Sequence, residues 1–105
     1  MSNYQPTITA EELKTRMDNN ENLFIIDVRE PWENEEFNIG ALNIPLASLP
    51  AHVEELKERM NDEIIVHCAM GGRSANAQMM LQQMGFTQVR NLIGGMNGWK
   101  EKFIK

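Results

Sequence analysis

Short apolar runs alternate with amphipathic segments from one end of the chain to the other. Residues 23–28 and 64–67 are largely apolar on both faces. Runs of this length are typical of strands buried between two layers of helices. We predict these two strands, a third at residues 89–92, and a brief extended piece at residues 43–45, where the proline disfavours helix.

The segments around these strands carry the start signals of helices. Thr9 and Glu12 form a capping box, in which the threonine oxygen accepts a backbone N–H and the glutamate reaches back. Ser48 is placed to cap a helix with Pro50 in its first turn. The predicted helices open at Thr9 and at Ser48 and span residues 31–37, 74–84 and 96–103.

Strands that are joined through helices form parallel pairs with right-handed crossovers. The alternation therefore predicts an α/β fold, a three-layer sandwich with a mostly parallel sheet of four or five strands and helices on both faces. Ligands of such sheets bind outside the carboxyl ends of the strands. Asp27 lies at the carboxyl end of the first of these strands, and Cys68 follows the second.

Composition narrows the classes of function. The chain has 105 residues, enough for one domain at residues 1–105, and a net charge of −5 with no basic stripe for nucleic acid. The longest apolar run is too short for a membrane span, and the first residues do not form a secretory signal. We expect a monomer with no metal or other cofactor. The single cysteine excludes an internal disulfide and a CxxC zinc site, and it fits a reducing compartment such as the cytoplasm.

The segment from His67 to Ser74 carries the candidate chemistry. A strand delivers Cys68, two glycines let the backbone curl, and a helix begins at once. This arrangement aims backbone amides and a helix N-terminus at the sulfur, which favours the thiolate. A lone cysteine is more often a small buried apolar residue. Its place between strand end, glycines and helix start reverses that preference and indicates a nucleophile.

The spacing between Cys68 and Arg73 separates two kinds of anion-binding loop. Four residues lie between them, and position 74 is serine. Cysteine-dependent phosphatases place five residues between cysteine and arginine, which gives a loop wide enough for phosphate. The shorter loop fits a cysteine that carries one additional sulfur atom.

Three motifs resemble the rhodanese homology family along nearly the whole chain: DVREPWENEEF at residues 27–37, CAMGGRS at 68–74 and LIGGMNGW at 92–99. The resemblance implies a five-stranded parallel sheet and a ping-pong reaction. In that reaction Cys68 takes sulfur from a small anionic donor such as thiosulfate, becomes a persulfide, and passes the sulfur to cyanide, a thiol or a protein acceptor. Residues 37–41 depart from the family, being one residue shorter and lacking its histidine and proline.

The candidate site residues fall into three groups. Cys68 is the expected nucleophile, and Arg73 is the side chain expected to orient an anionic donor. We expect an ion pair between Asp27 and Arg29 to brace the loop, and a structural role for His67, which strand alternation turns away from the pocket. The loop expected to stabilise the thiolate and bind substrate comprises Ala69, Met70, Gly71, Gly72, Arg73 and Ser74, with Met70 at the pocket mouth.

Three functions remain open from the sequence. The first is a sulfurtransferase that works through a Cys68 persulfide. The second is a persulfide carrier or docking module with little turnover of small molecules. The third is a phosphatase or arsenate reductase, against which the short loop and the single cysteine both count.

Overall fold

The fold is an α/β sandwich, seen here in a computed structural model that describes residues 3–104. The described residues form five strands, β1 (Thr7–Ile8), β2 (Ile25–Asp27), β3 (Leu42–Asn43), β4 (Glu63–His67) and β5 (Gln88–Leu92). The helices are α1 (Ala10–Asp18), α2 (Pro31–Glu36), α3 (Leu49–Leu56), α4 (Gly72–Gln83) and α5 (Gly95–Phe103), and two 3-10 turns, η1 (Leu46–Ser48) and η2 (Lys57–Arg59), flank α3.

All four strand pairs are parallel, and the order across the sheet is β1-β5-β4-β2-β3. The predicted parallel sheet is therefore confirmed, with five strands. The short strand β1 was not among the strands expected from the apolar runs, because two residues are too few to show a pattern. The longest strands, β4 and β5, pair at the centre of the sheet and end beside the predicted loop.

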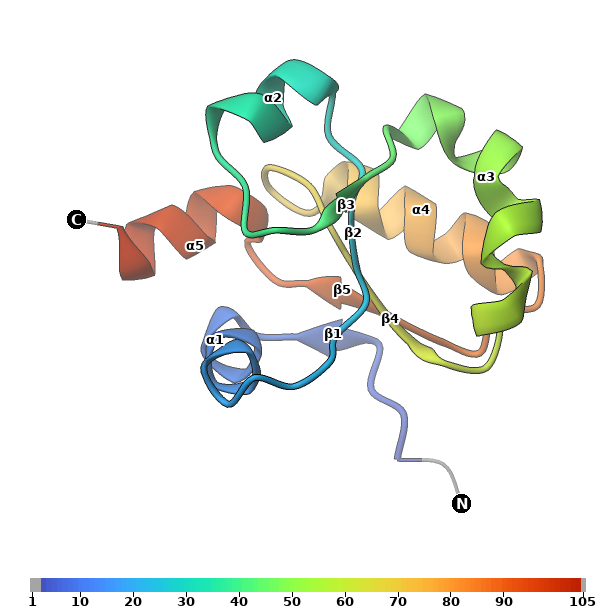
Figure 1. The fold of residues 1–105 in the computed structure, drawn as a ribbon, viewed down its shortest axis with the longest axis horizontal. Helices are drawn as coiled ribbons and strands as arrows, with labels where there is room; N and C mark the ends of the chain where they lie inside the picture. Colours follow the sequence, from blue (N-terminus) through green and yellow to red (C-terminus); the bar gives the residue numbers. More distant parts are fainter. Residues whose placement is uncertain (1–2, 105) are drawn as a thin grey trace.

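Helices cover both faces of the sheet (Figure 1). On one face, alternate residues of the strands pack against α3 and α4 in a core that includes Ile26, Ile64, Val66, Leu49 and Leu81. On the other face, Ile25, Ile65 and Leu92 pack against α1 and α5 in a second core with Leu13 and Trp99. Helix α2 lies near the carboxyl edge of the sheet, as Figure 1 shows. None of the helices within residues 3–104 is both long and apolar enough to cross a membrane.

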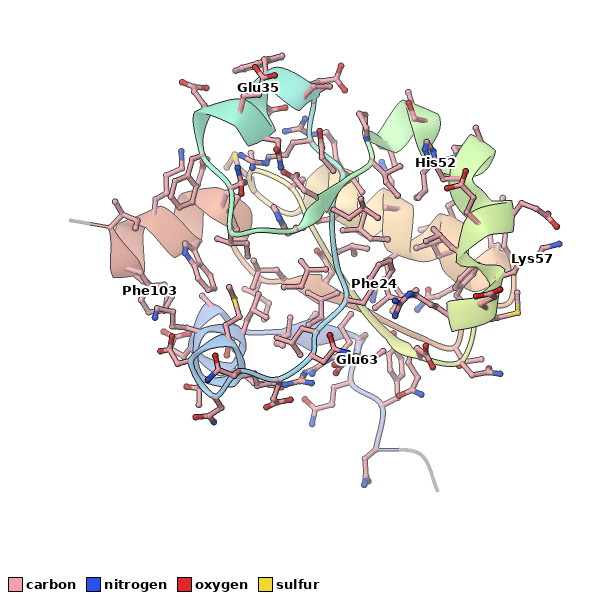
Figure 2. All side chains as sticks on the ribbon, in the orientation of Figure 1. Phe24, Glu35, His52, Lys57, Glu63 and Phe103 are labelled. Carbon is pink, nitrogen blue, oxygen red and sulfur yellow. The ribbon has the colours of Figure 1, made fainter. Side chains whose placement is uncertain are left out.

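Charged side chains gather at the amino edge of the sheet. Arg90 donates to Glu12 at 2.9 Å and to Glu63 at 3.2 Å, and Arg16 also pairs with Glu63, at 2.7 Å. In Figure 2, Glu63 lies at the start of β4, well away from Glu35 of α2.

The ion pairs of Arg90 modify the predicted capping box. Thr9 accepts the backbone N–H of Glu12 at 3.0 Å as expected, but the Glu12 carboxylate binds Arg90.

Helix α5 begins at Gly95, one residue earlier than predicted, and two other helix starts differ in ways that matter for the site. Ser48 makes no side-chain cap, because η1 has already brought its backbone into the helical region, with φ −91° and ψ −11°. Helix α4 begins at Gly72, two residues earlier than predicted, so the amides of Arg73 and Ser74 belong to its first turn.

Candidate active site

The Cys68 side chain is fixed by the strand that precedes it. Strand β4 ends at His67, and Cys68 shares the face of Ile64 and Val66, where it is 1% exposed. Neighbours at odd positions, such as Ile65, point to the other face, as strand alternation requires. The sulfur therefore lies at the carboxyl end of the central strand, at the base of the loop that leads into α4.

Three groups donate, or can donate, hydrogen bonds to the sulfur. The backbone N–H of Gly71 donates to Sγ at 3.0 Å and that of Ser74 at 3.4 Å, and the Ser74 hydroxyl lies 3.3 Å away. The loop reaches this shape because Gly71 adopts φ +121°, a conformation that side chains rarely permit.

The loop changes the acidity of the thiol. Burial alone raises the pKa of Cys68, because it disfavours the charged thiolate. The Ser74 hydroxyl and the amides of Ser74, Gly71 and Met70 outweigh that effect and lower the pKa below its usual range. The loop therefore favours the nucleophilic form of the sulfur.

The loop backbone is held from behind by helix α5. The amides of Met96 and Asn97 donate to the carbonyls of Cys68 and Ala69, both at 2.9 Å. Gly95 makes this approach possible, because a Cβ there would lie 2.5 Å from the Cys68 carbonyl oxygen and 2.6 Å from that of Ala69. The second glycine of the predicted turn, Gly95, thus allows close packing of α5 against the loop.

Arg73 is held by an acidic residue that the sequence did not single out. Its guanidinium donates two hydrogen bonds to Glu33 of α2, at 2.7 and 2.9 Å. This pairing lowers the pKa of Glu33 to about 2, because the Arg73 guanidinium stabilises the carboxylate. The Arg73 side chain is 38% exposed, so part of it faces solvent beside the loop.

Asp27 and Arg29 form the predicted ion pair, buried at the end of β2. The guanidinium binds both carboxylate oxygens, at 2.9 and 2.8 Å. Burial raises the pKa of Asp27, but the hydrogen bonds from Arg29 and Asn34 outweigh it and hold the pKa below its usual range. Arg29 also donates to the Phe37 carbonyl at 2.7 Å, so these bonds hold α2. Helix α2 in turn carries Glu33, the partner of Arg73.

His67 lies buried, on the side of the sheet away from Cys68. Neither ring nitrogen has a hydrogen-bond partner among the described residues, and Nδ1 is 3.8 Å from an Asp27 oxygen. Burial lowers the pKa of His67 to about 4 although Asp27 opposes the shift, so the ring is neutral near pH 7. Its orientation agrees with the prediction from strand alternation.

Asn91 of β5 is a further polar residue beside the loop that the sequence did not indicate. Its Oδ1 lies 2.6 Å from the Ser74 hydroxyl oxygen, and its Nδ2 donates to the Gly71 carbonyl at 3.3 Å. The central position of β5 next to β4 brings it there. The predicted residues 68–74 therefore lie together, with Asn91 and Glu33 added from distant segments. Met70 projects outward and is 75% exposed.

Known proteins are similar to this chain in both sequence and fold. Residues 9–102 match the Rhodanese-like domain family. YrkF of Bacillus subtilis, a candidate sulfur carrier protein, is 40% identical over 98 residues, which cover 92% of this chain. The chain spans about half (52%) of the length of that relative.

Other relatives are of similar size. Thiosulfate sulfurtransferase PspE of Escherichia coli is 36% identical over 70 residues, which cover 66% of this chain and 67% of PspE. The crystal structure of a rhodanese-related protein from Thermoplasma volcanium aligns with a TM-score of 0.82 at 29% identity, covering 96% of each chain. The relatives thus include sulfurtransferases and a candidate sulfur carrier, and the chain belongs to the rhodanese-like domain family.

Proposed function

We propose that this chain, acting as a single domain, transfers sulfane sulfur from a small anionic donor such as thiosulfate to a thiophilic acceptor through a persulfide on Cys68. The observation that carries the proposal is the placement of the sulfur, which receives the amides of Gly71 and Ser74 and sits beside the Ser74 hydroxyl. Donors fixed in this way stabilise negative charge on sulfur at little reorganisation cost.

The proposed reaction has two steps. The Cys68 thiolate attacks the outer sulfur of thiosulfate, a new S–S bond forms, and sulfite leaves with the electron pair of the broken S–S bond. An acceptor thiolate or cyanide then attacks the outer sulfur of the persulfide, and the Cys68 thiolate leaves. No oxidant or reductant is consumed. An external acceptor is required because Cys68 is the only cysteine of the chain.

The loop residues take different roles in this proposal. The amides at Gly71 and Ser74 stabilise first the thiolate and then the persulfide. Arg73 attracts the anionic donor, and Glu33, whose carboxylate lies 2.7 Å from the guanidinium, keeps Arg73 beside the loop. The pair of Asp27 and Arg29 braces the loop indirectly, through α2.

Intact-mass measurement after incubation with thiosulfate tests the proposal. The protein should gain the mass of one sulfur atom, free sulfite should appear in equal amount, and Cys68→Ala should abolish both signals. Cyanide should then remove the added mass and release thiocyanate. A protein that gains no sulfur from thiosulfate, mercaptopyruvate or an organic persulfide refutes the proposal.

A second candidate is a persulfide carrier that serves a protein acceptor. Large apolar side chains are exposed at the carboxyl edge of the sheet, with Met70 75%, Trp32 64% and Ile93 54% exposed. Exposed apolar groups around a reactive sulfur favour contact with a protein. Slow turnover with cyanide together with fast transfer to a protein thiol would select the carrier. Fast turnover with small acceptors alone would select the enzyme.

Phosphatase chemistry is the weakest candidate, because only four residues separate Cys68 from Arg73 and the carbonyls of Cys68 and Ala69 are tied to α5. Robust hydrolysis of an aryl phosphate would overturn this ranking. The single reactive thiol also leads us to propose a reducing compartment, such as the cytoplasm.

A further inference from the structure

The Ser74 hydroxyl has one proton and three acceptors within reach. Its oxygen lies 2.6 Å from Asn91 Oδ1, 3.2 Å from the Gly71 carbonyl oxygen and 3.3 Å from Cys68 Sγ. The hydroxyl can satisfy one of them well at a time, since its hydrogen is directed by a single rotation about Cβ–Oγ. The direction of this proton decides whether the sulfur faces a hydrogen or a lone pair.

Asn91 settles that direction while Cys68 is a thiol. Its Nδ2 faces the Gly71 carbonyl oxygen at 3.3 Å. Reversing the amide would place two acceptor oxygens against each other, so Oδ1 must face Ser74. The 2.6 Å contact joins the Ser74 hydroxyl oxygen and Asn91 Oδ1. An amide oxygen carries no proton, so the hydroxyl donates to Asn91. Its lone pairs then face the sulfur, where they accept the S–H of the thiol.

We propose that Asn91 is a positioning residue for Cys68 that acts through Ser74. While the sulfur is a thiol, the Ser74 hydroxyl donates its hydrogen bond to Asn91, and when the thiolate forms, the same hydroxyl donates to the sulfur instead. The thiol proton leaves to solvent, the hydroxyl turns about Cβ–Oγ, its bond to Asn91 breaks, and a bond to the sulfur forms. The inference deepens the proposed function, on which it rests. Asn91 thus competes with the thiolate for one hydrogen, and it sets how readily the nucleophile forms.

Asn91→Leu adds or removes no charged group around the sulfur. Arg73 of α4 faces the loop and is paired with Glu33 of α2. His67 of β4 is neutral near pH 7, because burial lowers its pKa to about 4. Asp27 of β2 is paired with Arg29. The first turn of α5 has the sequence GMNG and contains no charged residue. A shift caused by the variant is therefore assigned to the hydroxyl.

Alkylation of Cys68 by iodoacetamide as a function of pH tests the proposal without any sulfur donor. Asn91→Leu keeps the branch at Cγ, is larger and has no acceptor, so the hydroxyl loses its shortest contact and donates to the thiolate more readily. The pH profile should move to lower pH, and the rate below its midpoint should rise by about threefold to tenfold, since hydrogen bonds to charged groups are strong. Ser74→Ala should move the profile to higher pH.

The double variant separates positioning from support of the loop. In a Ser74→Ala background, Asn91→Leu should leave the profile where Ser74→Ala alone puts it. If Asn91 merely supported the Gly71 carbonyl, Asn91→Leu would lower the reactivity of Cys68, and it would do so equally in both backgrounds. No shift for Asn91→Leu, a shift to higher pH, or an equal shift in both backgrounds overturns the proposal.

Asn91→Asp provides a second variant if leucine prevents folding. The carboxylate holds the hydroxyl more strongly, so the profile should move to higher pH, and by more when Ser74 is present than in the Ser74→Ala background. An equal shift in the two backgrounds contradicts the proposal, with circular dichroism checking the fold of each variant. Alkylation needs no sulfur transfer. A negative result for Asn91 is therefore distinguishable from a negative result in the intact-mass test of the proposed function.

Discussion

Gly95 lies where helix α5 meets the loop, and replacing it with alanine has two separate costs. Its φ of +57° is left-handed, which costs a residue with a Cβ about 1–2 kcal/mol. The new Cβ would also lie 2.5 Å from the Cys68 carbonyl oxygen and 2.7 Å from the Ala69 carbonyl carbon. Backbone atoms must move to relieve such contacts, at a typical cost of about 1–3 kcal/mol.

The expected total for Gly95→Ala is therefore a loss of about 2–5 kcal/mol in the free energy of unfolding. For a domain of this size each kcal/mol corresponds to roughly 4–8 °C in melting temperature. Urea unfolding and thermal melting measure the loss. Persulfide formation at Cys68 should fall as well, because the displaced carbonyl belongs to the residue that carries the sulfur.

Two neighbouring glycines serve as matched controls. Gly94 has φ +79°, but its nearest contact for a Cβ is an ordinary 3.6 Å to Gly98 Cα, so Gly94→Ala should cost only about 1–2 kcal/mol. Gly98 lies within α5, where a Cβ would meet only the Ile93 carbonyl oxygen at an ordinary 4.0 Å, and Gly98→Ala should stabilise by about 0.5–1 kcal/mol. If Gly95→Ala is no more destabilising than Gly94→Ala, the close approach of α5 to the loop does not have the assigned energetic weight.

Three further substitutions test the titratable groups near the loop. His67 has a pKa of about 4 in the folded chain against 6.5 ordinarily, so stability should fall by about 3 kcal/mol as pH drops from 6.5 to 4. His67→Leu should remove that slope from urea unfolding, and an unchanged slope would contradict a neutral buried ring. Glu33, whose pKa is lowered to about 2, stabilises the fold above pH 4.5, and this contribution is lost as pH falls toward 2. Glu33→Gln should remove the pH dependence of stability between pH 4.5 and 2. It should also weaken the binding of thiosulfate by Arg73, measured as a raised KM, and an unaltered KM would contradict the coupling of Glu33 and Arg73. Asp27→Asn leaves the buried Arg29 charge without its partner and should cost about 3–5 kcal/mol in urea unfolding, whereas a loss below about 1 kcal/mol would show that the pair is dispensable.

The parts of the site that the sequence predicted are those encoded locally. Residues 64–67 carry the strand pattern, and the glycines before Ser74 allow the turn that brings amides to the sulfur. The parallel sheet followed from the alternation of strands and helices. The bond between Thr9 and the amide of Glu12 was also local, spanning three residues.

The residues that were missed come from distant segments. Glu33 meets Arg73 across 40 positions and Asn91 meets Ser74 across 17, and only the order of strands in the sheet brings each pair together. Glu12 shows the same limit, because Arg90 competes for its carboxylate from 78 positions away. An acidic helix and a polar strand position have many solvent-exposed uses, so neither signalled a site.

The two backbone bonds from α5 restrict how this site can diversify. With the Cys68 and Ala69 carbonyls tied to Met96 and Asn97, an added loop residue must be accommodated beyond position 69 or break those bonds. The opening of the loop is therefore difficult to widen by small steps. Side chains remain free to vary, above all the exposed Met70. New sulfur donors or acceptors are accordingly more accessible to this scaffold through substitution at the rim than through a change in loop length.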